Sequence, residues 1–311
     1  MEISYGTEGT SIIVTYICYN KLKKHTIIKI PSGDNERAAY FGDPVPGVRK
    51  SIFIKQHTNL LTYDDTKIIY IDTQTNEIYV DTIPDYIQAI YFDVEKKLAE
   101  IQASLTLKYG TFAEELPEQK MAVSYLTGDE KVLEIGGNIG RNSLVIATIL
   151  KAKGNNNLVV LESNPESAEQ LKENRDINNL NFFIEASALS KRKLVQQGWV
   201  TIASDSVPDG FTSVNIININ ELRAKYSINF DTLVLDCEGA FFYIIMDMPE
   251  ILDGIKLIIM ENDYYIYDHK IYVDDKLRRA NFKCVYSEKG GGLASWCKCE
   301  PFFYQVWQKN V

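Results

Sequence analysis

The sequence predicts an α/β fold in which a small all-β domain precedes a doubly wound, mostly parallel sheet of seven strands. Two observations support the sheet: apolar strand-like runs alternate with helical patterns through the second half of the chain, and residues 131–150 read as strand, glycine-rich turn and helix. Residues 1–85 instead contain short β-rich runs separated by Gly, Pro and Asn. Alternation of strands and helices favours a parallel sheet, whereas short strands with frequent breaks favour an all-β domain.

The composition is that of an acidic chain with enough apolar residues for a full core. The chain has 311 residues, of which 45% are hydrophobic, and its net charge is -9. This length predicts two domains. The acidic balance, without basic runs interleaved with aromatic residues, disfavours a protein that binds the nucleic acid backbone.

The sequence predicts neither a metal site nor a membrane segment. The five cysteines are scattered apart from Cys297 and Cys299, and the three histidines are dispersed. One such cysteine pair, without partner ligands at metal spacing, is typical of alternating strand residues rather than of a zinc site. No apolar run is long enough to span a bilayer, and the N-terminus lacks a signal-peptide pattern. We therefore expect a cytoplasmic protein without a membrane partner.

Residues 1–85 are expected to form the all-β accessory domain. Turn-forming residues occupy positions 31–34, and a turn with two prolines occupies positions 42–47. Pro, Gly and Asp favour turns because they either fix the backbone angles or widen the accessible range. The predicted strands cover residues 11–16, 26–30, 51–54, 67–71 and 76–80.

Residues 86–118 are expected to link the two domains. Over residues 86–109 the apolar side chains recur at intervals of three and four, the spacing of an amphipathic helix, and no Pro or Gly interrupts them. A second helical stretch, residues 117–126, leads into the first strand of the sheet. The α/β domain is assigned to residues 119–311.

The α/β domain is organised around residues 131–150, which read KVLEIGGNIGRNSLVIATIL. The glycines permit a tight turn and a close approach of a ligand, and the helix directs its unpaired N–H groups at the turn. The spacing is neither the GxxxxGK[ST] of a phosphate loop nor a full GxGxxG. A second apolar strand, residues 158–161, ends at Glu162, about twenty residues after the turn. A Rossmann-like scheme places there the carboxylate whose two oxygens bind a ribose diol.

The remaining pattern completes the sheet. A helix over residues 164–178 begins with Asn164 as its cap and Pro165 as its first residue. Residues 187–214 are polar and read as irregular apart from residues 198–203, and long loops at the ligand end of such a sheet select the substrate. The further strands cover residues 181–186, 230–236 and 254–261, followed by an antiparallel pair, residues 282–287 and 302–308, joined across residues 290–292.

Three segments, in order, resemble the FkbM family of methyltransferases. They are VLEIGGNIGRNSL from Val132, VVLESNPESAEQLKENRDINNL from Val159 and LVLDCEGAFFYII from Leu233. The corresponding family forms are close to VLDIGANIG…SL, FEPNP…L..N…N and LKIDVEGAE…L. The resemblance covers about residues 120–259. It implies a Rossmann-like class I methyltransferase fold, with S-adenosylmethionine as the cofactor.

The resemblance also implies which residues bind the cofactor. Glu162 would bind the ribose, with Ser163 beside it, and Asn164 or Ser187 would lie near the adenine. Asp236 would lie beside the transferred methyl group. The methionine end would be lined by Glu134, Gly136, Gly137, Asn138, Gly140, Asn142 and Ser143.

Methyl transfer to a hydroxyl needs a base, because the pKa of the hydroxyl is far above neutrality. Asp236 is the first candidate for this base, and the reserves are Glu238, Asp263 and His269. A Mg²⁺ site made by Asp236, Glu238 and Asp263 stays an alternative, since hard cations take carboxylate ligands. The resemblance to FkbM enzymes favours a hydroxyl of a sugar or glycoconjugate as the acceptor.

Two residues depart from the family pattern. Val234 stands where the family usually has Lys, and Phe241 stands where it has an acid. These departures leave the identity of the base open. They also keep open a first rival hypothesis, a catalytically weak scaffold that binds S-adenosylmethionine. A second rival, an RNA 2′-O-methyltransferase, is disfavoured by the acidic balance and by the lack of a Lys-Asp-Lys-Glu set.

The first domain resembles a small β module of the form YG…VT…DPxPGxxK, found in proteins of large DNA viruses and in some J-domain proteins. The matching segments are Tyr5-Gly6, Val14-Thr15 and residues 41–54. The resemblance implies a docking surface or a homodimer formed through this domain. It also implies a viral protein that modifies glycans, in the host cytoplasm or the virion. The alternative is that residues 42–47 form only a rigid turn.

Overall fold

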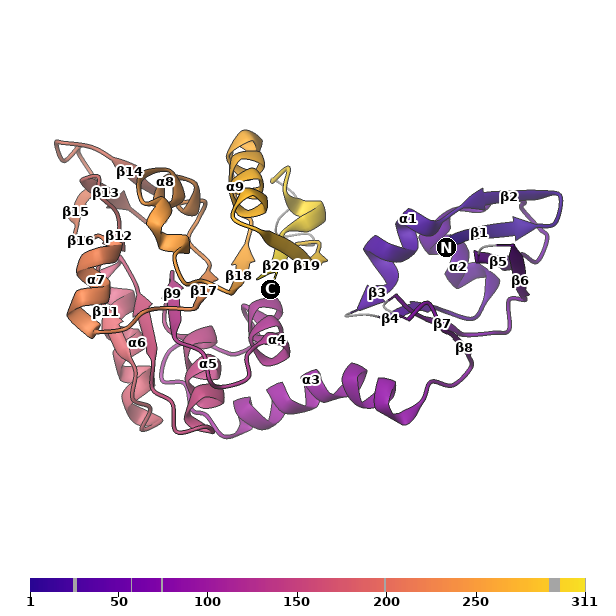
Figure 1. Cartoon of the computed structure of the whole chain (residues 1–311), viewed down its shortest axis with the longest axis horizontal. Helices are drawn as coiled ribbons and strands as arrows, with labels where there is room; N and C mark the ends of the chain where they lie inside the picture. The colour runs from indigo at the N-terminus through magenta and orange to yellow at the C-terminus, as the bar shows by residue number, and fades with distance from the viewer. Residues whose placement is uncertain (25–26, 57, 74, 199, 291–296, 311) are drawn as a thin grey trace. The chain divides into compact units, whose positions relative to one another are not determined.

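The computed structural model describes residues 1–24, 27–56, 58–73, 75–198, 200–290 and 297–310. The chain divides into two compact units, Met1–Asp93 and Val94–Val311. The division falls within helix α3 (Asp85–Ala103), the helix that was expected to link two domains (Figure 1). Within the described ranges, none of the helices is both long enough and apolar enough to cross a bilayer.

The first unit contains two antiparallel sheets of four strands each. One sheet has the order β2-β1-β5-β6 and the other has the order β3-β4-β7-β8. Inward-facing apolar side chains, among them Ile3, Ile52 and Ile71, form one core. The strands are β1 (Glu2–Thr7), β2 (Thr10–Ile13), β3 (Lys23–Lys24), β4 (Ile27–Ile30), β5 (Ser51–Gln56), β6 (Asn59–Tyr63), β7 (Ile69–Asp72) and β8 (Ile78–Val80).

The prediction of an all-β first domain is wrong, because this unit also contains helices. Strand β2 ends at Ile13, and the chain continues into α1 (Thr15–Ile17) and a π-helical turn, η1 (Cys18–Leu22). Helix α2 (Asp34–Phe41) lies between Gly33 and Gly42, which both have positive φ. The acids in its first turn favour a helix at this position through the helix dipole. Residue 26, the first of a predicted strand, lies outside the described residues.

The double-proline turn is held by a buried cation. Nζ of Lys50, whose side chain is 1% exposed, lies 3.0 Å from Oδ2 of Asp34 and 2.8 Å from Oδ1 of Asp43. The Tyr5 hydroxyl donates to Oδ1 of Asp34 over 2.6 Å. Because a charge is buried at low cost only when it is paired, these contacts give the YG…DPxPGxxK residues a structural role.

The second unit is built on a seven-stranded sheet with the order β11-β10-β9-β17-β18-β20-β19. The neighbouring strands from β11 to β18 are parallel, and β20 runs antiparallel to both β18 and β19. The mixed sheet and its terminal antiparallel pair were both predicted. The strands are β9 (Val132–Ile135), β10 (Leu158–Leu161), β11 (Phe183–Glu185), β17 (Thr232–Leu235), β18 (Leu257–Glu261), β19 (Phe282–Glu288) and β20 (Tyr304–Lys309).

Helices cover both faces of this sheet. Alternate strand residues such as Leu133 and Leu235 pack in one core cluster, and their neighbours Val132 and Val234 pack in another. Successive strand side chains point to opposite faces, so the continuous apolar runs of β9 and β17 reflect burial on both sides. The helices are α4 (Leu116–Tyr125), α5 (Arg141–Lys151), α6 (Pro165–Ile177), α7 (Ile219–Tyr226), α8 (Phe241–Asp247) and α9 (Tyr267–Arg279), with the 3₁₀ turns η2 (Pro249–Leu252) and η4 (Glu300–Phe302).

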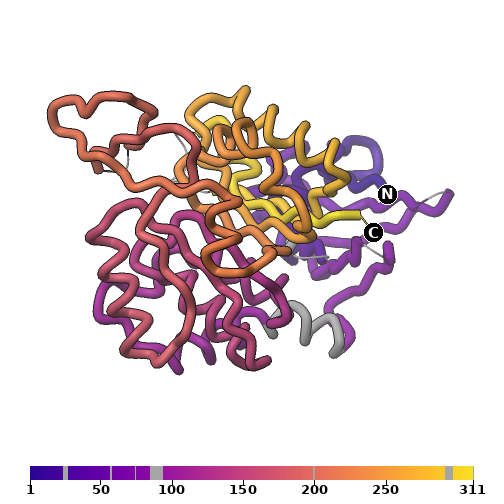
Figure 2. Tube along the Cα trace, turned by 60° about the vertical axis from the view of Figure 1, so that its left-hand side comes forward, coloured from indigo at the N-terminus to yellow at the C-terminus, as the bar shows by residue number. Residues whose placement is uncertain are grey.

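The segment that follows β11 is more regular than predicted. It contains β12 (Ala188–Leu189), which pairs with β16 (Ile216–Ile217), and a separate antiparallel sheet with the order β14-β13-β15. The part of the chain near residue 200 projects at the upper left of Figure 2. Strand β14 falls within residues 198–203, the one part of the segment that did not read as irregular. The other strands are short and carry little apolar periodicity, so the sequence pattern did not show them. The separate sheet comprises β13 (Leu194–Gln197), β14 (Val200–Ala203) and β15 (Thr212–Val214).

Candidate functional site

A cavity of about 730 Å³ lies in the second unit where the parallel strands end. Its floor is formed by residues at or just after the carboxyl ends of β9, β10, β17 and β18. The chain leaves β9 toward β10 on one side, and β17 pairs with β9 on the other side. This is the switch point of an open α/β sheet, where such folds bind their ligands. The volume is within the range of small-molecule sites.

The glycine turn after β9 has a packing role that the sequence did not reveal. A Cβ on Gly136, which has a φ of +90°, would lie 1.6 Å from the carbonyl oxygen of Asp236. A Cβ on Gly137 would lie 2.2 Å from Val160, and one on Gly140 would lie 2.3 Å from Leu171. Gly137 and Gly140 therefore allow close packing of the turn and do not line the cavity, whereas Gly136 does.

Glu162 is fixed at the end of β10 by backbone donors. Its Oε2 accepts from the N–H of Asn138 and its Oε1 accepts from the N–H of Asn164, each over 2.7 Å. Burial raises the pKa of Glu162, and these N–H groups oppose that rise. Asn138 reaches this position with a φ of +45°, in the left-handed region that Asn tolerates. The two donors leave further lone pairs on each carboxylate oxygen for a ligand.

The other residues predicted for the adenine end lie at two places. Ser163 and Ser187 line the cavity. Asn164 does not line it, and its Oδ1 caps helix α6 by accepting from the N–H groups of Glu166 and Ser167. The side chain of Asn164 is thus used by the helix, and only its N–H serves Glu162.

Three residues predicted to line the methionine end, Glu134 in β9 and Asn142 and Ser143 in the first turn of α5, are buried and do not line the cavity. Within the described part of the chain, Oε2 of Glu134, Oδ1 of Asn142 and Oγ of Ser143 have no hydrogen-bond partner. Burial raises the pKa of Glu134 to about 8. At neutral pH the carboxyl is therefore largely protonated, and it can donate to a neighbouring oxygen.

Val234, the first departure from the family pattern, lies next to Glu134. The two residues are partners in the register of β17 and β9, and Val234 packs in the core cluster on the face covered by α4 and α5. If a lysine stood at this position, the first atoms of its side chain would lie beside Glu134, on a buried face of the sheet. The valine therefore leaves Glu134 without a neighbouring cation, which agrees with its raised pKa.

We expect Glu134→Gln to remove a pH dependence of stability. The pKa of Glu134 is about 8 in the folded protein and 4.5 in the unfolded chain. Between pH 4.5 and pH 8 the folded state therefore binds more protons than the unfolded state, so the free energy of unfolding falls as the pH rises through this range. Glutamine mimics the protonated acid. The variant should unfold in urea with the same free energy as the wild type near pH 4 and exceed it by about 3–5 kcal/mol at pH 9. The exposed Glu166→Gln should show no such difference, and parallel curves for all three proteins would contradict the account.

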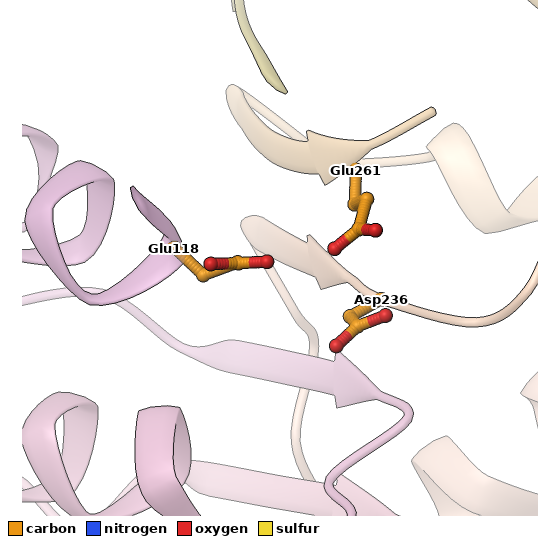
Figure 3. Close-up of side chains that lie close together, drawn as sticks. All are labelled: Glu118, Asp236 and Glu261. Atoms are coloured by element: carbon orange, nitrogen blue, oxygen red, sulfur yellow. The ribbon is translucent and has the colours of Figure 1, made fainter. Parts of the chain in front are cut away.

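Three carboxylates from different elements meet at the cavity floor. Glu118 comes from α4, Asp236 follows β17, and Glu261 ends β18. One oxygen from each lies within 4.8 Å of the other two, and Figure 3 shows the side chains directed toward one another. Burial and then the charges of neighbouring acids raise the pKa of Asp236 well above its usual value, and burial with Asp236 does the same for Glu261. Like charges at this separation oppose joint ionisation.

The loops after β17 and β18 each bring one more acid to the same floor, Glu238 and Asp263. Burial and the charge of Glu238 raise the pKa of Asp263 to about 7. Oδ1 of Asp263 accepts from the N–H of Gly239 over 2.6 Å, and its buried Oδ2 has no hydrogen-bond partner among the described residues. Glu238 has a φ of +52°, a costly backbone conformation for this residue type. Asp263 thus holds a strained loop against the cavity, as is common at functional sites.

The wall opposite the acids comes from the inserted strands and α8. Leu194, Gln196 and Thr201 of the separate sheet line it. Among the described residues of the cavity lining, Arg192 is the only lysine or arginine, and its Nη2 lies 2.8 Å from Oδ1 of Asp247. This ion pair ties the inserted segment to the end of α8.

His269, a reserve candidate for the base, lies outside the cavity. Its ring stacks on Phe242 with centroids 3.7 Å apart and an angle of 3°, and it meets Tyr243 edge to face. It therefore packs α9 against α8. The structure instead places Glu118, Glu261 and Tyr304 at the cavity, none of which the sequence analysis selected. The sequence did hold a signal for Glu261, because this acid ends the predicted strand of residues 254–261. It held no signal for Glu118, because only the packing of α4 brings that residue to the cavity.

Comparisons with known proteins give distant structural likenesses. No family model and no curated protein match the chain. A solved ribosomal protein L11 methylase from Lactobacillus delbrueckii subsp. bulgaricus has a TM-score of 0.40 at 14% identity, covering 66% of this chain and 82% of its own. An O-methyltransferase from Bacillus cereus in complex with SAH has a TM-score of 0.37 at 13% identity, covering 70% and 88%. A methyltransferase FkbM from Methylobacillus flagellatus KT has a TM-score of 0.40 at 10% identity, covering 72% and 60%. The fold is assigned from the strand order and not from these likenesses.

Proposed function

We propose that the second unit is an S-adenosylmethionine-dependent O-methyltransferase whose acceptor is a hydroxyl of a sugar or glycoconjugate. The observation that carries the proposal is the carboxylate of Glu162, held at the switch point of the sheet by the N–H groups of Asn138 and Asn164. A carboxylate fixed in this way beside a glycine turn suits a ribose diol. The FkbM-like segments of the sequence support the same assignment.

The residues present fit the cofactor. Glu162 faces the cavity with lone pairs free for the two ribose hydroxyls, and Ser163 and Ser187 lie beside it with the small side chains that a flat base needs. Gly136 and Asn138 line the floor next to Asp236. The acids of this floor favour a ligand that carries positive charge, as the sulfonium and the ammonium group of S-adenosylmethionine do.

Bound S-adenosylmethionine would supply a methyl group already activated by its sulfonium. The protein then has to align the acceptor and take its proton. Asp236 is the proposed base, because it lies on the cavity floor at the end of β17, and the positive charge of a bound sulfonium would oppose the rise that burial and neighbouring acids give its pKa. A carboxyl with a raised pKa is a stronger base once ionised. Asp263, with a pKa of about 7, holds the loop that carries Glu238.

The cavity wall supports a neutral, hydroxyl-rich acceptor. Ser190, Gln196 and Thr201 contribute polar, uncharged side chains from the inserted segment. The several acids of the floor would repel a phosphate group, and the single lining arginine is engaged with Asp247. A sugar hydroxyl therefore suits the cavity better than a nucleic acid does.

The test is calorimetric titration of S-adenosylmethionine and S-adenosylhomocysteine into the full chain. We expect micromolar binding to the wild type and a loss of at least about tenfold in Glu162→Ala, because the ribose loses two hydrogen bonds to a charged group. Glu166→Ala, an exposed change four positions later, should bind as the wild type does. Absence of binding to the wild type, or equal binding by both variants, would contradict the proposal.

A further inference from the structure

Three acids from different elements meet at Glu118, Asp236 and Glu261, and a side-chain hydrogen bond joins Glu118 to Glu261. Three carboxylate oxygens, one from each residue, lie within 4.8 Å of one another (Figure 3). Glu118 is 6% exposed, and its buried Oε2 has no hydrogen-bond partner among the residues that the structure describes. Figure 3 shows this side chain directed from α4 at the other two. A buried carboxylate oxygen without a partner carries a desolvation penalty that a bound group would relieve.

The described surroundings of the three residues add negative charge and supply no cation. Glu115, Glu238 and Asp263 also line the cavity. Glu115 is engaged with Arg141, whose Nη1 lies 2.8 Å from its Oε1. Arg192, the only lysine or arginine among the described lining residues, is paired with Asp247. A bound cation would let these acids ionise together, which they otherwise oppose.

We propose that Glu118, Asp236 and Glu261 bind a hard divalent cation of the Mg²⁺, Mn²⁺ or Ca²⁺ class. Two oxygens on one ion are separated by at most twice the metal–oxygen distance, which is about 4 Å for Mg²⁺ and about 5 Å for Ca²⁺. Each of the three oxygen–oxygen separations is 4.8 Å or less, so one ion of this class can bind all three oxygens after a side-chain adjustment of under about 1 Å. The donors are all carboxylates, without Cys or His, which excludes a preference for soft metals.

The placement of the three ligands favours a preorganised site. Asp236 and Glu261 stand at the ends of the paired parallel strands β17 and β18, and Glu118 stands in α4, which packs on the same sheet. Ligands on regular elements keep their separation better than ligands on loops. An ion held there would leave coordination positions open toward the cavity, where acceptor hydroxyls can bind. This last role rests on the proposed function, whereas the binding of the ion does not.

The experiment measures ion binding without catalysis. The full chain is stripped with a chelator and titrated with Mn²⁺, and free Mn²⁺ is read from its electron paramagnetic resonance signal. We expect one site, a loss of affinity of at least about tenfold in Glu118→Gln, and displacement of Mn²⁺ by Mg²⁺ or Ca²⁺. The exposed Glu166→Gln is the matched control and should bind as the wild type does. Circular dichroism establishes that each variant is folded.

A second readout makes the result independent of the Mn²⁺ signal. Mg²⁺ and Ca²⁺ should raise the melting temperature of the wild type and of Glu166→Gln but not that of Glu118→Gln. Absence of Mn²⁺ binding by the wild type at millimolar concentration, or equal binding by Glu118→Gln, overturns the inference. Calorimetry with S-adenosylhomocysteine in the presence of a chelator separates the ion site from the proposed function. If the protein binds the cofactor but no ion, only the inference of an ion site is contradicted.

Discussion

Asp236→Asn should lower the rate of methyl transfer by about 10²–10⁴-fold, because the amide cannot take the acceptor's proton. The rate is measured with labelled S-adenosylmethionine and whichever glycoside or oligosaccharide gives turnover with the wild type. Affinity for S-adenosylhomocysteine should change by less than about threefold, since the ribose contacts at Glu162 remain.

The control for this variant is Asp253→Asn, an exposed change in the same unit. It should keep the wild-type rate. A rate for Asp236→Asn within a few fold of the wild type would remove Asp236 from the role of base. Asp263, also buried at the cavity floor and with a pKa of about 7, would then be the next candidate.

The second large effect is structural. Gly136→Ala should destabilise the second unit by about 3 kcal/mol or more, because the new Cβ would lie 1.6 Å from the carbonyl oxygen of Asp236 and the residue has a φ of +90°. The oxygen that the new Cβ would meet belongs to the backbone and not to a flexible side chain. The ends of β9 and β17 would therefore have to separate at the cavity floor. Urea unfolding followed by circular dichroism measures the loss.

Gly154→Ala provides the matched control. Gly154 also has a positive φ, +69°, but nothing lies within 4 Å of the position of its Cβ. This variant should lose only about 1 kcal/mol, the cost of the left-handed backbone alone. If the two variants lost equal stability, the close approach of the glycine turn to Asp236 would not contribute to the destabilisation, which would contradict this account.

The sequence predicted residues of the fold and the site correctly where the local pattern also determines the place of the residue in the fold. Glu162 was selected because an apolar strand ends there at the right distance from a glycine turn, and strand ends in a parallel sheet meet at one edge. The antiparallel terminal strands could be predicted because their apolar runs follow the last parallel strand. Gly136 was also selected, but for a different reason. The close approach of a ligand was expected to require a glycine there, whereas in the structure the close approach of the Asp236 carbonyl oxygen requires it.

The failures involve contacts between distant segments. Glu118 occupies an ordinary helical position, and only the packing of α4 on the sheet brings it to Asp236 and Glu261. Glu134 belongs to the strand of the motif but lies on the face of the sheet beneath α5, so burial removes it from the cavity. Helix α2 was missed because turn-forming residues precede it and its apolar pattern is weak.

Val234 shows how a departure from a family pattern can mislead. It was taken to bear on the catalytic base, because it stands two residues before Asp236. Side chains two apart on a strand share a face, but Asp236 follows the end of β17 and lines the cavity, whereas Val234 is buried opposite Glu134. The change therefore affects the charge of a buried pair and not the cavity.

The central claim is that the second unit binds S-adenosylmethionine against Glu162 at the end of β10. A crystal structure of the full chain with S-adenosylhomocysteine tests it most directly. The claim predicts both ribose hydroxyl oxygens at hydrogen-bond distance from the Glu162 carboxylate, about 2.5–3.0 Å, with the sulfur beside Asp236. A ligand bound elsewhere, or a ribose turned away from Glu162, would contradict it.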